Sequence, residues 1–146
     1  MKKLLTYLFI ALIASLIAFL IRDVTAEYIV SNIQGAVNNN TIVRSWSTYY
    51  VSILTALEVG IGVVILYALL HTKLPTKIPV IKGCILGILM LMIQGELVRR
   101  PLIHLSQGQS LSSVVSQDGV TWFIWLLMCV FVAISFDFFK LGPSKK

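Results

Sequence analysis

The sequence predicts an all-α membrane protein with a single integral membrane domain over residues 1–146, built as a bundle of four transmembrane helices. Four apolar stretches support this prediction, at residues 4–21, 49–70, 78–98 and 120–139. Each is long enough as a helix to cross a hydrocarbon core of about 30 Å, which takes about 20 residues. The composition agrees, because 58% of the 146 residues are hydrophobic and the mean hydropathy is +0.90. Little of the chain is left for a soluble catalytic domain.

The basic residues predict how these helices are oriented. All eight lysines lie in the two termini and in the loop at residues 71–82, whereas all four arginines lie in the other two loops. Because positively charged segments stay on the cytoplasmic side, we expect both termini to be cytoplasmic (N-in/C-in), in a bacterial cytoplasmic (inner) membrane. The net charge of +6 is then explained by lysines that anchor helices and contact anionic lipid. It does not indicate a nucleic-acid partner.

The first apolar stretch follows two lysines, which is also how a signal peptide begins. Its apolar run of about 18 residues exceeds the usual length of a signal-peptide core, so we interpret it as the first transmembrane helix. Beyond Arg22, Ile29, Ile33 and Val37 recur every four residues. This spacing predicts an amphipathic extracytoplasmic segment over residues 24–37, which either extends the first helix or lies along the membrane surface.

The other connections are predicted from their composition. Pro75 and Pro79 make the inner loop short and stiff, so we expect the second and third helices to be antiparallel neighbours. Pro101 ends the third helix or starts a following turn. Residues 105–119 are rich in Ser, Gln and Gly, which is typical of an external loop.

No stretch of the sequence carries a chemical motif, so we expect a protein that is not an enzyme and that holds no cofactor and no metal. Its two cysteines, Cys84 and Cys129, form no C-x-x-C pair. The histidines His71 and His104 fall on opposite sides of the predicted topology, where they cannot share a metal ion within one chain. The serines of residues 105–116 match no nucleophile motif.

Glu58 is the polar residue that most needs an explanation, because it lies near the middle of the second predicted helix. A carboxylate at that depth costs at least about 2.5 kcal/mol on insertion scales, so we expect it to face protein, water or a cation. On a helix, Glu58 shares one face with Val51, Thr55 and Gly62. Glu58 and Thr55 are therefore interpreted either as a proton or cation site or as an interhelical hydrogen bond or ion pair that fixes packing.

A second group of charged residues is expected at the outer face of the membrane. Arg99 and Arg100 follow Glu96 by three and four residues, a spacing that allows a local ion pair at the level of the lipid headgroups. Together with Arg22 and His104, they define the predicted outer-face cluster. The cluster is interpreted as an ion-pair network or as an anion or headgroup site, since guanidinium groups suit phosphate oxygens.

Three glycines predict where helices approach closely. Gly62 leaves room on the Glu58 face of the second helix for a partner helix. Gly83 and Gly87 form a small-x-x-x-small pair, so we expect the third helix to pack inward through its glycine face.

These observations leave three functional hypotheses. The first is a non-enzymatic accessory, assembly or stabilising subunit of a larger membrane complex, whose partners are membrane lipids and either other integral membrane proteins or further copies of this chain. The second is a small oligomeric transporter or channel that uses Glu58 for proton or cation coupling. The third is a membrane enzyme or lipid-modifying helper that uses the outer-face cluster. The sequence names neither a substrate nor a partner.

Overall fold

The computed structural model describes residues 2–33 and 46–141, and these residues are almost entirely helical. Five helices follow one another in the described residues: α1 (Lys2–Ile33), α2 (Trp46–Leu70), α3 (Pro79–Gln94), α4 (Arg99–Ser106) and α5 (Leu111–Phe138). No strand occurs in the described residues, so the all-α prediction is confirmed.

Three of these helices, α1, α2 and α5, are each long and apolar enough to cross a membrane. The helices α3 and α4 reach that length only together, and they bend by 47° at the short break between them. Alone, the 16 residues of α3 rise about 24 Å, which is less than the thickness of a hydrocarbon core. The described residues therefore contain three helices that are able to span a membrane by length and composition, or four if α3 and α4 form one bent span, which is consistent with a membrane-embedded helical protein.

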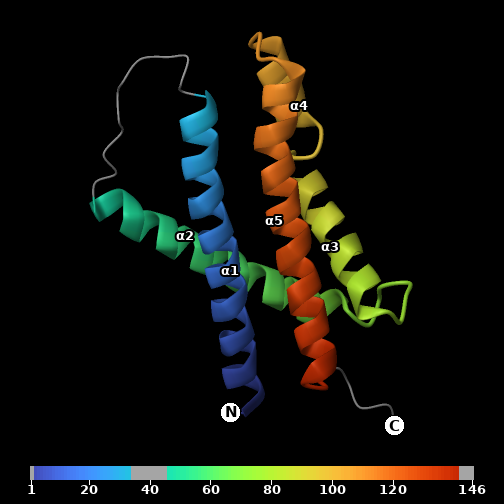
Figure 1. Cartoon of the computed structure of the whole chain (residues 1–146). Helices are drawn as coiled ribbons and strands as arrows, with labels where there is room; N and C mark the ends of the chain where they lie inside the picture. The colour runs from blue at the N-terminus through green and yellow to red at the C-terminus, as the bar shows by residue number, and fades with distance from the viewer. Residues whose placement is uncertain (1, 34–45, 142–146) are drawn as a thin grey trace.

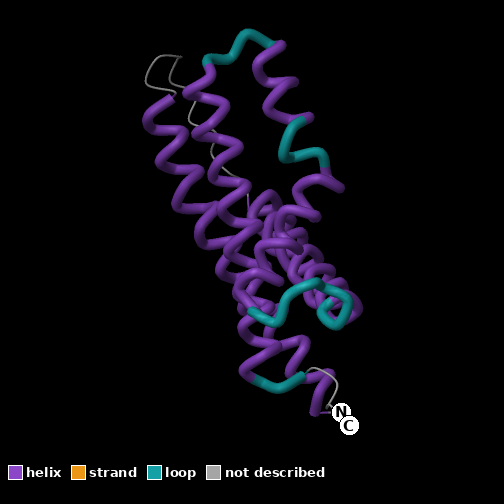
Figure 2. The backbone as a smooth tube through the Cα atoms, turned by 90° about the vertical axis from the view of Figure 1, so that its right-hand side faces the viewer, coloured by secondary structure: helices purple, strands orange, loops and turns teal. Residues whose placement is uncertain are grey.

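The helix α5 lies at the centre of the arrangement, because it contacts each of the other four helices. Figure 1 shows α1 and α3 on two sides of α5, with α4 beside the first turns of α5. The first turn of α1 and the last turn of α5 lie at the same end of the molecule. Figure 2 shows the loop from α4 to α5 at the opposite end. The polar ends of α4 and α5 are thereby brought together, far from the first turn of α1 and the last turn of α5.

The second helix, α2, crosses α1 obliquely instead of running beside α3 (Figure 1). Its close approach uses Gly60, where a Cβ atom would collide with the Ser15 side chain and the Ala11 carbonyl oxygen. The expectation that the second and third helices are antiparallel neighbours is wrong, because α3 packs on α5 while α2 packs mainly on α1. A short proline-containing loop limits the distance between two helix ends, but the glycine contacts decide which helices pack together.

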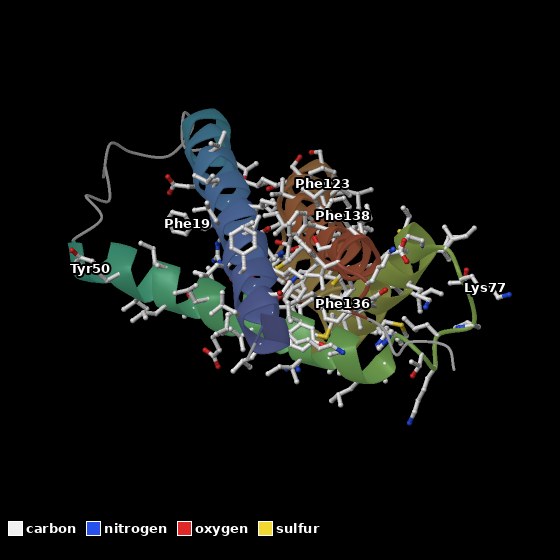
Figure 3. All side chains as sticks on the ribbon, turned by 90° about the horizontal axis from the view of Figure 1, so that it is seen from below. Phe19, Tyr50, Lys77, Phe123, Phe136 and Phe138 are labelled. Carbon is white, nitrogen blue, oxygen red and sulfur yellow. The ribbon has the colours of Figure 1, made fainter. Side chains whose placement is uncertain are left out.

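The buried core lies where α1, α2 and α5 meet. Tyr67 of α2 and Tyr7 of α1 both contact the ring of Phe136, with ring centroids 5.0 Å and 5.2 Å from it. Figure 3 shows Phe136 in the space between these helices, in contrast to Phe138, which is 78% exposed. Inside a membrane, helices associate through van der Waals packing rather than through removal of apolar surface from water. We therefore expect these interlocking rings to hold the three helices together.

The third helix approaches α5 through its glycine face. A Cβ atom at Gly83 would lie 2.5 Å from the Cα atom of Val130, and one at Gly87 would lie 3.0 Å from the Leu126 side chain. Both glycines are buried. Any larger residue would push the two backbones apart, which is the physical reason for small residues at this spacing.

The third helix ends at Gln94, four residues before the predicted end at residue 98. Gly95 stops it, because its backbone adopts the left-handed conformation (φ 73°) and its N–H bonds back to the last turn. Pro101 lies in the first turn of α4, where its missing N–H removes no helical hydrogen bond. The chain therefore turns at Gly95 and restarts as a separate short helix.

Most of the predicted external loop at residues 105–119 is helical, so that prediction is wrong. Only residues 107–110 are outside helices. The Ser110 hydroxyl caps α5 by accepting a hydrogen bond from the Ser113 N–H at 3.3 Å. The Ser116 hydroxyl donates to the Ser112 carbonyl oxygen one turn earlier. Serines that are typical of a loop thus serve as a cap and as surface residues of a helix.

The first helix continues without a break to Ile33. The described part of segment 24–37 therefore extends the first helix, and residues 34–37 lie outside the described residues. This settles, for residues 24–33, the choice between an extended helix and a segment lying along the surface.

Candidate functional site

Three ionisable side chains lie at intervals of four residues around the bend between α3 and α4. They are Glu96 in the turn and Arg100 and His104 on α4. Four residues make slightly more than one helical turn, so Arg100 and His104 project from the same face of α4. Because α4 packs against α5, this charged face meets the first turns of α5.

Asp118 is the residue of α5 that this face meets, and it is completely buried, with 0% of its surface exposed. Its two carboxylate oxygens lie 3.5 Å from Arg100 Nε and 3.4 Å from His104 Nδ1. Arg100 also donates to Glu96 Oε2 at 2.5 Å. A buried carboxylate without nearby cations is strongly unfavourable, so the guanidinium group between two carboxylates explains how Asp118 is tolerated.

Trp122 links the same two segments one turn further along α5. Its indole Nε1–H donates to the Glu96 carbonyl oxygen at 2.9 Å. Five residues thus form one connected group, which we call the α4–α5 polar cluster: Glu96, Arg100, His104, Asp118 and Trp122.

The contacts of Asp118 have ion-pair distances but lack hydrogen-bond geometry. Both of its carboxylate oxygens, and His104 Nδ1, are buried and have no hydrogen-bond partner among the described residues. Chemically, the cluster can compensate the buried negative charge of Asp118, because Arg100 and His104 both lie within ion-pair distance of it. Within the described part of the chain, no group of three or more His, Cys, Asp or Glu side chains is placed to hold a metal ion.

The structure unites three members of the predicted outer-face cluster and separates the other two. Glu96, Arg100 and His104 belong to the α4–α5 polar cluster, whereas Arg22 is exposed on α1, which does not pack against α4. Arg99 is exposed on α4, and the ion pair with Glu96 is made by its neighbour Arg100. Neither Arg22 nor Arg99 forms an ion pair with a carboxylate that the structure describes.

Sequence reasoning missed Asp118, because it lies in a stretch whose composition is typical of a loop. Two signals could have found it. The four-residue spacing of Glu96, Arg100 and His104 predicts a charged helix face that needs a partner inside a membrane protein. Asp118 and Trp122 have the same spacing, which places them together on one face of a helix.

Glu58 lies in different surroundings, on the face of α2 that points away from the core. This exposed α2 face consists of Val51, Leu54, Thr55, Glu58, Ile61, Gly62, Ile65 and Leu69. No ion pair or hydrogen bond joins the Glu58 carboxylate to any residue that the structure describes. The opposite face of α2 contributes Val63, Val64 and Tyr67 to the core.

The two neighbours assigned to Glu58 lie on the same exposed face. The Thr55 hydroxyl donates to the Val51 carbonyl oxygen at 3.0 Å. A Cβ atom at Gly62 would meet no heavy atom within 4 Å. The close helix contact of α2 is made by Gly60, two residues earlier, so the room beside Gly62 is left open on the surface.

Comparison with known proteins adds no relative to these observations. No protein-family model matches the chain, and no curated protein or solved structure is significantly similar to it.

Proposed function

We propose that this chain is a non-enzymatic subunit of a larger membrane complex, in which it serves as an accessory, assembly or stabilising component. Its place would be the bacterial cytoplasmic (inner) membrane, with both termini in the cytoplasm, as the distribution of lysines favours. The partners would be integral membrane proteins that dock on the exposed α2 face.

The exposed position of Glu58 carries this proposal. The carboxylate lies within the apolar span at Ile53–Leu70, on a surface that is otherwise formed by side chains such as Leu54 and Ile65. A charged carboxylate facing lipid costs at least about 2.5 kcal/mol, and such groups in membrane proteins nearly always face protein or water. Since no described residue of this chain pairs with Glu58, a second protein supplies the missing partner.

Gly62 supports the same proposal because it has no side chain to keep another helix away. It lies one turn after Glu58, and open space surrounds it on the exposed side of the helix. Small residues at a helix surface allow the backbone of another helix to approach closely. A polar group and an open small residue one turn apart suit a partner helix that hydrogen-bonds to Glu58 and packs over Gly62.

The test is purification of the tagged full chain in a mild detergent, followed by mass spectrometry of the proteins that remain bound and of the native complex. We expect stoichiometric recovery of a membrane partner with the wild-type chain. We expect Glu58→Leu and Gly62→Leu to abolish recovery, and Glu58→Gln to retain most of it, because an amide can still hydrogen-bond.

Gly119→Leu is the matched control for Gly62→Leu. Gly119 also has nothing within 4 Å of a Cβ atom, but it lies on α5. The proposal fails if Gly119→Leu reduces partner recovery as much as Gly62→Leu, or if Glu58→Leu leaves recovery unchanged.

A second candidate is a small oligomeric transporter or channel in which Glu58 couples to protons or cations. The same observation favours it, because the exposed α2 faces of several copies would place their carboxylates around a common path. Here Glu58→Gln would abolish pH-dependent flux in liposomes while the homo-oligomer persists. Recovery of a different membrane protein with the wild-type chain would decide against this candidate.

A further inference from the structure

The bend between α3 and α4 leaves an open groove on the outside of the molecule. The groove has a volume of about 670 Å³, and apolar side chains form most of its wall, including Met92, Leu97, Val98, Leu102 and Ile103. These side chains come from the last turn of α3, from the turn at residues 95–98 and from α4. Because the two helices diverge by 47°, neither of them covers this apolar surface.

Among the described residues that form the wall of this groove, Arg99 is the charged one. Its aliphatic part lies against Gly95, since a Cβ atom at Gly95 would be 3.3 Å from Arg99 Cδ. The next residue, Arg100, is paired with Glu96 and Asp118, whereas Arg99 has no ion pair with a described carboxylate. The two adjacent arginines therefore differ: Arg100 is neutralised within the fold, and Arg99 leaves a guanidinium group to be neutralised from outside.

The position of the groove along the chain indicates its surroundings. The apolar helix α3 ends at Gln94, and the residues that follow it are rich in charged and amide side chains. Such a change in composition marks the boundary between the hydrocarbon core and the lipid headgroups. At this boundary a lipid presents a phosphate group directly above its acyl chains, so a cation next to an apolar groove matches the order of groups in a phospholipid.

We propose that this groove binds one anionic phospholipid, with Arg99 on the phosphate and the apolar wall against an acyl chain. A guanidinium group fits phosphate oxygens through two parallel hydrogen bonds. The single unpaired positive charge complements a lipid with one net negative charge better than a zwitterionic lipid. The inference does not depend on the exposed α2 face, because the groove is formed by α3, the turn at residues 95–98 and α4.

The test is a titration of the purified full chain in detergent with phosphatidylglycerol or phosphatidylcholine of the same acyl chains, read by native mass spectrometry. We expect phosphatidylglycerol to bind more tightly to the wild-type chain, and we expect Arg99→Ala to weaken that binding about tenfold. Arg99→Lys, which keeps the charge but loses the planar fork, is expected to retain part of the preference. Val98→Trp fills the groove from an exposed position and is expected to weaken the binding of both lipids.

Arg22→Ala is the matched control, because Arg22 is also exposed and lacks an ion pair with a described carboxylate, but it lies on α1 away from the groove. It is expected to leave the affinity for phosphatidylglycerol unchanged. Equal affinity of the wild-type chain for the two lipids would overturn the proposal. So would an Arg99→Ala variant that binds phosphatidylglycerol like the wild type, or an Arg22→Ala variant that loses as much affinity.

The thermal stability of each variant is measured alongside. Because Arg99 and Val98 are both exposed, we expect the variants at these positions to fold like the wild type.

Discussion

Asp118 on α5 and Glu58 on α2 are both acidic residues in helices that are apolar enough to cross a membrane, but the fold surrounds them differently. Asp118 is fully buried, and the side chains of Arg100 and His104 lie within ion-pair distance of its carboxylate. Glu58 is exposed, with no ion-pair partner among the described residues. An acidic residue whose compensating groups belong to its own chain contributes to the fold. An acidic residue without such groups is the basis for the proposed docking surface on α2.

The largest effect on the stability of the isolated chain is expected for Arg100→Ala. Arg100 is itself partly exposed, so the cost comes from Asp118, which stays buried without its guanidinium partner. We expect a loss of about 3 kcal/mol in the free energy of unfolding, measured by reversible denaturation in detergent micelles. In an Asp118→Asn background the same change is expected to cost less than about 1 kcal/mol. Equal losses in the two backgrounds would show that Asp118 and Arg100 are not coupled.

A smaller loss in the free energy of unfolding is expected for a substitution at the point where α2 crosses α1. Gly60→Ala places a methyl group against Ser15 and the Ala11 backbone and should cost about 2 kcal/mol through overpacking. Gly62→Ala, two residues away, meets open space and should stabilise the helix by up to about 1 kcal/mol. The same denaturation experiment checks both variants. If the two substitutions have the same effect, the close contact between α1 and α2 is not at Gly60.

The hydrogen bond from Trp122 to the Glu96 carbonyl oxygen is expected to contribute less to the free energy of unfolding than the Arg100–Asp118 ion pair does. Trp122→Phe removes this donor and should lower the free energy of unfolding by about 1 kcal/mol. Trp125→Phe serves as the control, because it removes an indole from the same helix that donates no hydrogen bond to a described residue. If Trp125→Phe lowers the free energy of unfolding as much as Trp122→Phe does, the loss comes from packing of the indole ring and not from the hydrogen bond to Glu96.

The smallest effect on the isolated chain is expected at Glu58, although this residue dominates the proposed docking surface. Glu58→Leu and Glu58→Gln should each change the free energy of unfolding by less than about 0.5 kcal/mol, as is usual for exposed sites. Association with the partner should nevertheless be lost in Glu58→Leu. If Glu58→Leu destabilises the isolated chain as much as Arg100→Ala does, Glu58 has a role inside the fold, and the contrast with Asp118 disappears.

The positions of the apolar helices could be predicted from the sequence, because every backbone polar group in a hydrocarbon core must be paired within its own segment. A long apolar run therefore has few alternatives to a helix. The helix ends were harder to predict. The Ser-rich composition of residues 105–119 fits a loop and an exposed helix face equally well. The end of α3 came earlier than predicted because Gly95 adopts a left-handed conformation there.

The candidate site could be predicted only in part. The four-residue spacing of Glu96, Arg100 and His104 is visible in the sequence, and so is the unusual depth of Glu58. The partner of the charged face was not predicted, because the rest of α4, the loop at residues 107–110 and the first turns of α5 separate Asp118 from Arg100. Local patterns specify one helix face at a time, and they do not specify which two faces meet.

The sequence by itself determined that the chain is helical and membrane-embedded, that it has small-residue faces, and that it carries acidic residues in apolar helices. These properties follow from hydropathy and helical periodicity, which act within one segment. The tertiary structure decided that α3 packs on α5 and not on α2, that Asp118 meets Arg100, and that Glu58 faces outward. The reason is that helix pairing depends on how whole surfaces fit together, and the contacts at Gly60 and Gly83 set that fit across segments far apart in the chain.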